Sequence, residues 1–388
     1  MIGNLLKMKT ANEMINRDRL VKSFMELGLV DGTYGHEREI ANELMVRLKS
    51  LGIDSRMDDA GSSFGGDAGN IRARLSGNPN AQSILLCAHI DTIQSTKNLR
   101  HIIDNGMITS DGTTILGGDD RAGVAVILEI VEILKENSLP HGPIELIFTV
   151  CEESGMHGAK FIDVSELNSE FGFVFDCQAS PGNYIVEAPG AYSFKAVVHG
   201  RAAHAAVSPE KGIHAIQIAS MAISKLKLGR WAETGMLNVG TIHGGTSINV
   251  IPDQVEITGE TRNANEKELM NQIEYIRSIF ENTCRDNGGS VELEFIEKYG
   301  GYQFDDNEAV VIAAAKGIAA AGFNPVPIKY PGGSDANVLN KKGLHTVNLG
   351  VGFKNAHSFQ ECIAVEDLVA SANIGLNIVL NCGLTLKK

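Results

Sequence analysis

Apolar and polar positions in the first part of the chain alternate between helical patterns and short apolar runs. Residues 36–52 and 119–137 carry apolar side chains with the helical period, which predicts two amphipathic helices, the first ending at Gly52. Three short apolar runs are typical of buried strands and occupy residues 83–88, 144–150 and 172–175. Strands that alternate with helices in this way indicate an α/β fold with a mixed, largely parallel sheet flanked by helices.

The pattern changes near Pro189, where a second arrangement of strands and helices begins. The order there is strand, helix, strand, strand, helix, strand, with strands at 193–200, 236–244, 254–262 and 290–298 and helices at 212–226 and 266–287. This is the β-α-β-β-α-β order of a ferredoxin-like α+β domain. The first pattern returns after this segment. The sequence therefore predicts a larger domain of residues 1–190 plus 300–388, with a smaller domain of residues 191–299 inserted into it.

The composition excludes several classes of function. The formal net charge is −13, which argues against a surface that binds nucleic acid or an anionic membrane. No uninterrupted apolar run reaches the length of a membrane span, and the first residues lack the apolar core of a signal peptide. The six cysteines are scattered without a C-x-x-C pair, which favours reduced thiols over a disulfide framework. We therefore expect a soluble, cytoplasmic protein.

Acidic and imidazole side chains lie directly after the predicted strands or at the start of a helix. They are His89 and Asp91, the pair Asp119–Asp120, the pair Glu152–Glu153, Asp176 and His357. In open α/β sheets, active sites collect at the carboxyl ends of the strands. Because His89, Glu152 and Asp176 each follow a different apolar strand, we expect three strands to bring these side chains to one edge of the sheet.

This combination of imidazoles and carboxylates is typical of a catalytic metal centre. Nitrogen and oxygen donors without cysteine suit zinc, with manganese or cobalt as substitutes. The carboxylates are too many for one ion, and a carboxylate can bridge two ions that act together on a carbonyl. Each segment alone has an ordinary explanation, such as a hydrogen-bonded histidine, a solvated helix start or a helix cap. Their common position at one edge favours the metal centre.

The motifs also resemble those of a known family. His89-x-Asp91, the run Leu116–Gly123 (LGGDDRAG), Glu152–Glu153, Asp176, the run Gly332–Asp335 (GGSD) and His357 are together similar to the motifs of the M20 family of dizinc exopeptidases and amidohydrolases. The phrases LGGDDRAG, PHGPIELIFTVCEE and GGSDANVL most resemble its peptidase T-like (tripeptide aminopeptidase-like) branch. The resemblance spans nearly the whole chain. It implies a zinc exopeptidase-like catalytic domain with an inserted lid domain that also serves dimerisation.

The resemblance implies a role for each residue of the cluster. Asp119 would bridge two zinc ions, whose other ligands would be His89 and Asp176 on one side and Glu153 and His357 on the other. Asp91 would orient His89 through the other nitrogen of its ring. Glu152 would be the general base that takes a proton from the attacking water and returns it to the leaving amine.

The smaller domain carries polar residues for which the resemblance implies contacts with the substrate. His204 would stabilise the oxyanion, often from across a dimer interface, and small residues around it leave room for a substrate. Asn249 and Arg262 would hold a carboxylate of the substrate, since the planar guanidinium can pair with a carboxylate through two hydrogen bonds. A surface salt bridge with Glu260 or Glu256 is the alternative for Arg262.

The glycine-rich segment at residues 332–335 has two compatible explanations. Gly333 and Ser334 could form only a turn into a helix, or they could also present backbone N–H groups to an anionic end of the substrate. We expect both.

The implied function is hydrolysis of a terminal peptide bond of short peptides by a dizinc-dependent exopeptidase, with a tripeptide aminopeptidase-like activity as the first candidate. A carboxypeptidase, a dipeptidase and an N-acyl amino acid amidohydrolase would use the same metal centre and stay open as alternatives. A non-catalytic binding protein on this scaffold is a further alternative, against which the complete set of ligands and base argues. The expected partners are a short peptide or acyl amino acid, two Zn²⁺ ions (or Co²⁺ or Mn²⁺) and a second copy of the chain, bound through the smaller domain.

Overall fold

The computed structural model describes residues 11–386. The chain divides into two compact units, each with a hydrophobic core of its own. The larger unit contains the residues up to Val186, Phe304–Ile328 and the residues from Ser334 onwards. The smaller unit contains Glu187–Gln303 and also the short segment Lys329–Gly333, which lies outside the range 191–299.

A mixed sheet forms the centre of the larger unit. In the described part of the chain its strands are β1 (Ser55–Met57), β2 (Ile71–Leu75), β3 (Ile84–His89), β6 (Ile144–Thr149), β7 (Phe171–Cys177), β8 (Asn183–Ala188), β16 (Tyr302–Gln303), β17 (Val326–Lys329) and β18 (Thr346–Gly350). Their order is β1-β2-β6-β3-β7-β18-β8-β16, with β17 also paired to β8. Strand β16, the last two residues of β8 and the last residue of β17 belong to the segments of the smaller unit. The strands β6, β3, β7 and β18 are parallel, whereas β2 and β8 flank them as antiparallel strands. The predicted α/β fold with a mixed sheet is confirmed.

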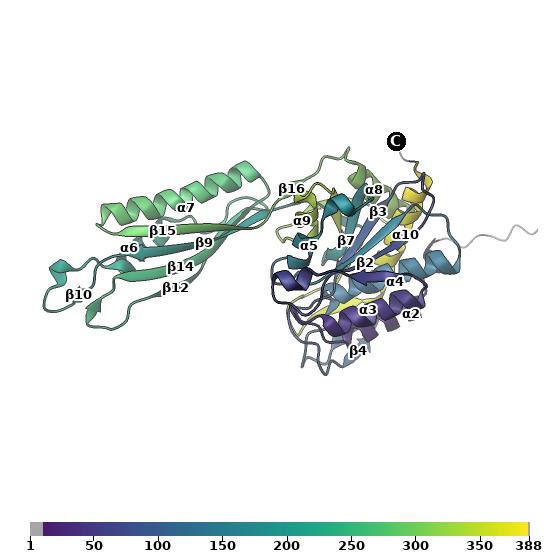
Figure 1. Cartoon of the computed structure of the whole chain (residues 1–388), viewed down its shortest axis with the longest axis horizontal. Coiled ribbons are helices and arrows are strands. Elements are labelled where there is room, and N and C mark those ends of the chain that lie inside the picture. The colour runs from purple at the N-terminus through teal and green to yellow at the C-terminus, as the bar shows by residue number, and fades with distance from the viewer. Residues whose placement is uncertain (1–10, 387–388) are drawn as a thin grey trace, which may run out of the picture. The chain divides into compact units, whose positions relative to one another are not determined.

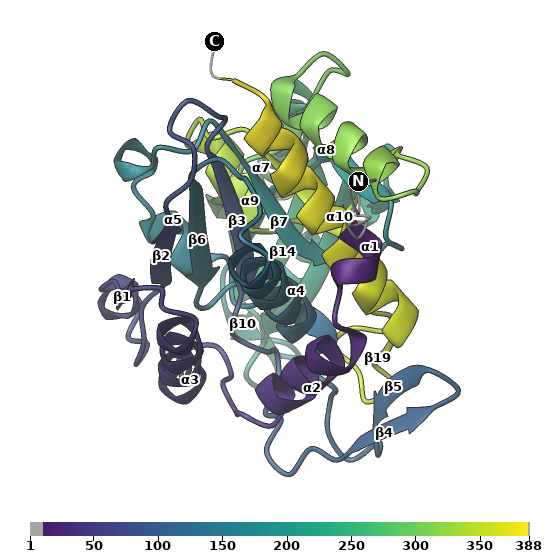
Figure 2. The same ribbon diagram turned by 90° about the vertical axis from the view of Figure 1, so that its right-hand side faces the viewer.

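Helices cover both faces of this sheet, which explains why its central strands are apolar. All residues of β3 and β6 are buried, as is usual for parallel strands between two helical layers. The helices are α1 (Ala11–Met14), α2 (Arg17–Gly28), α3 (Arg38–Ser50), α4 (Gly118–Glu136), α5 (His157–Phe161), α8 (Ala309–Ala320), α9 (Asp335–Lys341) and α10 (Val365–Leu384). Helices α4 and α10 pack against each other on one face, and α5 and α9 pack together on the other (Figures 1 and 2).

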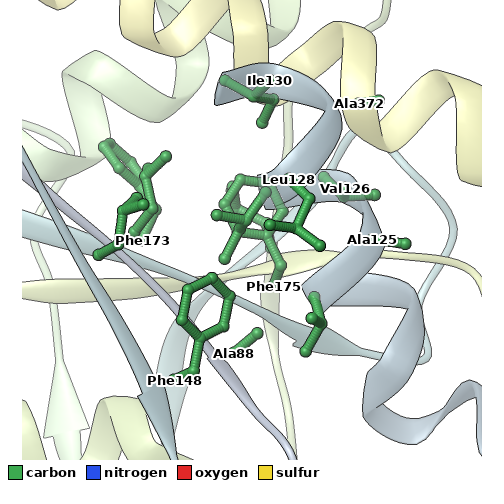
Figure 3. Close-up of a cluster of buried hydrophobic side chains, with 14 of the residues drawn as sticks. Ala88, Ala125, Val126, Leu128, Ile130, Phe148, Phe173, Phe175 and Ala372 are labelled. Carbon is green, nitrogen blue, oxygen red and sulfur yellow. The ribbon is translucent and has the colours of Figure 1, made fainter. Parts of the chain in front are cut away.

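Aromatic side chains of the sheet fix α4 in place. Figure 3 shows Phe148 of β6 and Phe173 and Phe175 of β7 in one buried cluster with Leu128 and Ile130 of α4. Burying one such side chain stabilises the fold by about 1.5–3 kcal/mol. The cluster therefore holds the first turn of α4, which carries Asp119, beside the carboxyl ends of the strands.

A small antiparallel sheet lies at the side of the larger unit. It consists of β4 (His101–Asp104), β5 (Met107–Ser110) and β19 (Cys362–Ala364), in the order β19-β5-β4. Two backbone hydrogen bonds join the ends of the loop before β19. The N–H of Lys354 donates to the carbonyl of Cys362 at 2.8 Å, and the N–H of Cys362 donates to the carbonyl of Lys354 at 3.0 Å. This loop carries His357.

The smaller unit is a sheet covered by two helices on one face (Figure 1). Its elements are β9 (Gly190–His199), β10 (Ala203–His204), α6 (Ala215–Lys225), β11 (Gly229–Arg230), β12 (Met236–Gly244), β13 (Val250–Ile251), β14 (Gln254–Asn263), α7 (Glu266–Asp286) and β15 (Ser290–Tyr299). The main strands are antiparallel in the order β11-β12-β14-β9-β15. The predicted ferredoxin-like order of strands and helices is present.

Helix α10 is long and apolar enough to cross a membrane, by length and composition only, and no other helix within residues 11–386 is. It packs against α4 and α8, and polar residues lie near both of its ends and in its middle. Asn377 donates from its side chain to the carbonyl of Asn373, and Asn381 donates to that of Asn377. The place of α10 in the core accounts for its apolar composition.

Gly317 in α8 allows a test of the packing between α8 and α10. A Cβ atom at this position would lie 2.8 Å from Cα of Ile378 in α10. We expect Gly317→Ala to lower the free energy of unfolding by about 1–3 kcal/mol, because overpacking outweighs the better helix propensity of alanine. Denaturation in urea measures the change. The control Ala319→Ser, at an exposed position of the same helix, should change it by about 0.5 kcal/mol at most. Equal losses in the two variants would contradict this packing.

Candidate metal centre

Three neighbouring strands bring predicted ligands to one edge of the large sheet. His89 is the last residue of β3, Asp176 lies near the end of β7, and Glu152–Glu153 follow β6 in the next loop. Because β3 pairs in parallel with both β6 and β7, the three carboxyl ends point the same way. Asp119 reaches them from the first turn of α4, and His357 from the loop between β18 and β19.

Asp119 lies between two imidazole rings. Its Oδ1 is 2.9 Å from Nε2 of His89, and its Oδ2 is 3.4 Å from Nε2 of His357. Farther out, Nε2 of His89 is 3.6 Å from Oδ1 of Asp176, and Nε2 of His357 is 3.0 Å from Oε2 of Glu153. The structure therefore places the five residues expected as ligands in one chain of contacts centred on Asp119.

The adjacent residues Asp119 and Asp120 are joined by a cis peptide bond. Their side chains have different surroundings. Asp120 is fully buried and accepts backbone hydrogen bonds from His89 at 3.2 Å and from Gly123 at 3.1 Å. Potential ligand atoms of Asp120 also lie close to those of His89 and Asp176. The oxygens of Asp120 are thus used by backbone N–H groups, whereas those of Asp119 face the two imidazoles.

Asp91 holds the loop that follows β6. Its two carboxylate oxygens accept the backbone N–H groups of Glu152 at 3.0 Å and Glu153 at 3.1 Å. Nδ1 of His89 lies 3.0 Å from the backbone carbonyl oxygen of Asp91 and 3.4 Å from its carboxylate. The nearest partner of this ring nitrogen is thus the backbone of Asp91, and the carboxylate mainly positions the two glutamates.

Burial, charge and hydrogen bonds lower the pKa of one carboxylate of the cluster and raise that of another. Burial disfavours the ionised form of Asp119, but hydrogen bonds from His357 and His89 outweigh it and lower its pKa. Burial and the charge of Asp119 raise the pKa of Asp176 to about 8. Hydrogen bonds to Asp119 and Glu153 raise the pKa of His357 to about 10. These carboxylates therefore need positive charge nearby to be ionised together.

The donor set fits divalent cations. Oε1 of Glu153 is buried and has no hydrogen-bond partner among the described residues, although Oε2 contacts His357. An unpaired carboxylate oxygen is costly to bury unless a cation or a donor compensates its charge. Two imidazoles with several carboxylates are ligands that zinc, cobalt and manganese accept in hydrolytic sites.

Glu152 is the carboxylate predicted as the general base. Burial raises its pKa well above the ordinary value, and the negative charges of Asp176 and Asp335 add to the effect, while His89 opposes it. Its backbone is fixed by the hydrogen bond to Asp91. A carboxyl group in such surroundings can exchange a proton with a group bound beside it.

His204 in the smaller unit has a defined ring orientation. Its Nδ1 accepts the backbone N–H groups of Ala206 and Val207, both at 3.2 Å. In the neutral ring the proton then resides on Nε2. The residue is exposed, so a ligand can approach this ring.

Arg262 and Asn249 have partners within the smaller unit. Nη2 of Arg262 is 3.1 Å from Oε2 of Glu260, and its Nη1 is 3.5 Å from the carbonyl oxygen of Pro331. The ion pair considered as the alternative for Arg262 is thus present. Asn249 is exposed and accepts a hydrogen bond of 2.6 Å from Oγ of Ser247.

The glycine-rich segment forms a turn into α9. Ser334 begins the helix with a capping box, in which its backbone N–H donates to Oδ1 of Asn337 at 3.0 Å. That N–H group is therefore engaged within the protein. Gly333 has no room for a side chain, because a Cβ atom would lie 2.5 Å from the ring of Tyr299.

Glu361 is a buried residue of the site that the sequence motifs do not single out. Its two carboxylate oxygens accept the backbone N–H groups of Gly117 at 2.7 Å and Asp119 at 2.9 Å. Burial raises its pKa to about 7, and the two N–H groups act in the opposite direction. It lies four residues after His357, and no periodicity of the sequence marks it as part of the site.

Glu37 and Arg121 also support the site without having been predicted. Oε1 of buried Glu37 accepts the backbone N–H of Cys151 at 3.0 Å, next to Glu152. The fully buried Arg121 donates to the backbone carbonyl of Ile90, between His89 and Asp91. Arg121 lies in the motif LGGDDRAG, whereas Glu37 lies at a helix start, where an acidic residue has an ordinary explanation.

Comparison with known proteins agrees with the geometry. The model of the peptidase family M20/M25/M40 matches residues 85–381. The uncharacterized protein YqjE of Bacillus subtilis is 39% identical, covering 94% of this chain and 99% of the relative. Peptidase T of Clostridium novyi is 25% identical, covering 95% of this chain and 92% of that protein.

Two solved structures have the same fold over nearly their whole length. The aminopeptidase PepT from Bacillus cereus has a TM-score of 0.91 at 38% identity, and a tripeptidase from Staphylococcus aureus has a TM-score of 0.92 at 35% identity. Each similarity covers 95% of this chain and 99% of the other. The chain therefore belongs to the peptidase family M20/M25/M40 and is a peptidase.

Proposed function

We propose that this protein is a dizinc-dependent exopeptidase that removes the N-terminal residue from short peptides, tripeptides among them. The observation that carries the proposal is the position of Asp119, whose carboxylate oxygens each face a different imidazole. A carboxylate placed in this way can be shared by two cations. The similarity to an aminopeptidase and a tripeptidase, at 38% and 35% identity, supports the substrate class.

The contacts suggest which residues hold each ion. Asp119 would be shared, with His89 and Asp176 at one ion and Glu153 and His357 at the other. When bound, zinc, or cobalt or manganese in its place, would polarise the scissile carbonyl and lower the pKa of a water molecule. The remaining steps depend on side chains of the protein.

Glu152 would move the proton of the reaction. Its carboxylate would take a proton from the attacking water and deliver it to the departing amine. The hydrogen bond from its backbone to Asp91 would keep it in place during both transfers. Its neighbour Glu153 faces His357, so the two adjacent glutamates have separate tasks.

His204 would stabilise the negative charge that develops on the carbonyl oxygen. Because two backbone N–H groups occupy Nδ1, the neutral ring carries its proton on Nε2, which would be the donor. A donor fixed in this tautomer needs no reorganisation when the charge appears. It could act within its own chain or in the site of a second subunit.

Arg262, Asn249 and Gly333 would bind the free carboxylate of the peptide. The side chain of Arg262 is 27% exposed, and its ion pair with Glu260 is partly exposed as well. Such pairs contribute about 0–1 kcal/mol, so a substrate carboxylate can replace Glu260 at small cost. Since the N–H of Ser334 is engaged in the capping box, Ser334 would contribute by fixing the turn.

We also propose a homodimer formed through the smaller unit. Strand β12 is paired along its length with β14, whereas on its other side, in the described residues, β11 pairs only with Met236 and Leu237. Ile242 on this strand is 47% exposed, and Ile248 in the following loop is fully exposed. An open edge with apolar side chains is suited to pairing with a second copy.

The cytoplasm is the compartment we propose. The six cysteines are free thiols, five of them buried. Unpaired cysteines are typical of a reducing compartment.

Substitution of the shared carboxylate tests the assignment of ligands. Asp119→Ala should abolish tight binding of both ions, because each loses a ligand, whereas His357→Ala should weaken mainly one. Elemental analysis after gel filtration should find about two ions per chain in the unmodified protein and about one in His357→Ala. The control Asp286→Ala, at an exposed carboxylate, should keep about two. A single tightly bound ion in the fully active enzyme would contradict the shared ligand.

The role of Glu152 is tested by Glu152→Gln, which keeps the shape and removes the proton acceptor. We expect kcat to fall by about 10²–10⁴-fold while the metal content stays unchanged. Steady-state kinetics and elemental analysis measure the two effects. The control Glu39→Gln, at an exposed glutamate, should leave both unchanged. Near-normal turnover of Glu152→Gln would exclude Glu152 as the base.

A digest of a peptide library with free and blocked termini tests the proposed activity. We expect mass spectrometry to show release of the N-terminal residue from short peptides and no cleavage after acetylation of the N-terminus. Zinc, cobalt or manganese should be added to the assay. Release of C-terminal residues, or cleavage of N-acyl amino acids alone, would instead indicate one of the other activities of the family.

Comparison of free-acid with amidated peptides separates the two explanations for Arg262. If Arg262 binds the substrate, Arg262→Ala should raise KM for free-acid peptides by roughly tenfold or more, with a smaller change for amidated ones. Glu260→Gln, which breaks only the ion pair, is the matched control. Equal changes for both kinds of peptide would leave Arg262 with a structural role.

A further inference from the structure

The carboxylate of Glu361 connects the two segments that carry Asp119 and His357. Glu361 has a relative exposure of 1%, so its side chain is removed from solvent. Its Oε2 accepts the backbone N–H of Gly117, and its Oε1 accepts that of Asp119. One side chain thus fixes the backbone on both sides of Gly118, immediately before the carboxylate that lies between the imidazoles.

The other end of this connection is the loop of His357. Lys354 and Cys362 close the loop through two backbone hydrogen bonds, and Glu361 donates its own N–H to the carbonyl of Ser358 at 3.1 Å. Ser358 follows His357 directly. A shift of the Glu361 side chain would therefore be transmitted to the imidazole through only a few bonds.

The surroundings leave little freedom for Glu361 to move. A Cβ atom at Gly118 would lie 3.1 Å from Oε1 of Glu361 and 3.3 Å from Cβ of Phe353. The glycine at this position therefore allows the turn to approach the carboxylate closely. Such a contact defines the position of the Asp119 backbone more narrowly than a solvent-exposed hydrogen bond would.

We propose that Glu361 is a positioning residue that sets the distance between Asp119 and His357 and so enables both to bind the same cation. This inference rests on the proposed dimetal function. Nε2 of His357 lies 3.4 Å from Oδ2 of Asp119, and the two residues are 238 positions apart in the sequence, so a long-range contact must hold them together. Within the described residues, Glu361 binds the backbone of the Asp119 turn and belongs to the loop of His357.

Glu361→Gln is the substitution that tests this role. The amide has the same shape but offers one acceptor oxygen and an NH₂ donor, so one of the two backbone N–H groups would face a donor. Competition with a chromogenic chelator should then show that one equivalent of Zn²⁺ or Co²⁺ binds about 10–100-fold more weakly, the usual effect of losing a group that supports a ligand. We expect kcat to fall with it, and KM to change by about twofold at most.

Glu145→Gln provides a matched control. Glu145 is 3% exposed, and its Oε2 accepts the backbone N–H groups of Asn168 at 2.9 Å and Ser169 at 3.0 Å, while its Oε1 accepts a hydrogen bond from Arg74. It lies at the start of β6, at the opposite end of the strand from Glu152. Its amide variant breaks the ion pair with Arg74 and should therefore lose stability, while it keeps the metal affinity of the unmodified protein.

The outcomes separate this inference from the proposed function. If the unmodified protein binds fewer than two ions or cleaves no peptide, the proposed function is wrong, whatever Glu361 does. If the unmodified protein binds two ions and Glu361→Gln binds them equally well, or if Glu145→Gln loses metal affinity to the same extent, the positioning role is wrong. Should Glu361→Gln fail to fold, Glu361→Asp replaces it, because its shortened carboxylate cannot reach both N–H groups and should weaken the same ion.

Discussion

The concentration of negative charge around Asp119 is the main constraint on the structure of this edge of the larger unit. Carboxylates with raised pKa values lie within a few ångströms of one another in a buried edge of the sheet, and two imidazoles compensate only part of their charge. Such a cluster is unfavourable unless cations join it and the backbone around it is held firmly. A second set of buried acidic residues fixes this backbone, because their carboxylates accept backbone N–H groups next to the first set. These residues are Asp91, Asp120, Glu37 and Glu361.

Some carboxylates of this edge gather around Asp119, and others accept backbone N–H groups. Both kinds are needed because of the parallel sheet. The carboxyl ends of β3, β6 and β7 bring His89, Glu152 and Asp176 together, but the loops beyond a strand end have no ladder to satisfy their backbone N–H groups. Side-chain oxygens supply the missing acceptors, as Asp91 does for Glu152–Glu153. The buried Arg121 completes the arrangement by donating to a carbonyl in the segment after His89. The core in Figure 3 fixes the strands, and these hydrogen bonds fix the loops.

The sequence was sufficient for the residues whose position depends on strand direction, and insufficient for those held by distant loops. His89 and Asp176 were predictable because each ends an apolar run, and parallel strands share an edge. Glu361 binds the backbone of Asp119 across 242 positions, and no local period reports such a contact. Asp119 and Asp120 are the same type of residue, and only the resemblance to the family distinguished them in the sequence; in the structure, Asp120 accepts backbone N–H groups and Asp119 faces the imidazoles. The ordinary explanation for Ser334 as a helix cap was also visible in the sequence and is part of the structure.

In the proposed function, the metal ligands belong to the larger unit, whereas His204 and Arg262, which would contact the substrate, belong to the smaller unit. The contacts of Asp119 involve residues of the larger unit, so they are independent of the substrate end that is recognised. His204 and Arg262 belong to the smaller unit, where one presents a fixed N–H donor and the other an exchangeable ion pair. A partly exposed ion pair is weak enough to be exchanged for a substrate carboxylate, whereas a buried one would not be. If Arg262 binds the substrate as proposed, substitutions around Glu260 would change which substrates bind without changing the charge balance at Asp119.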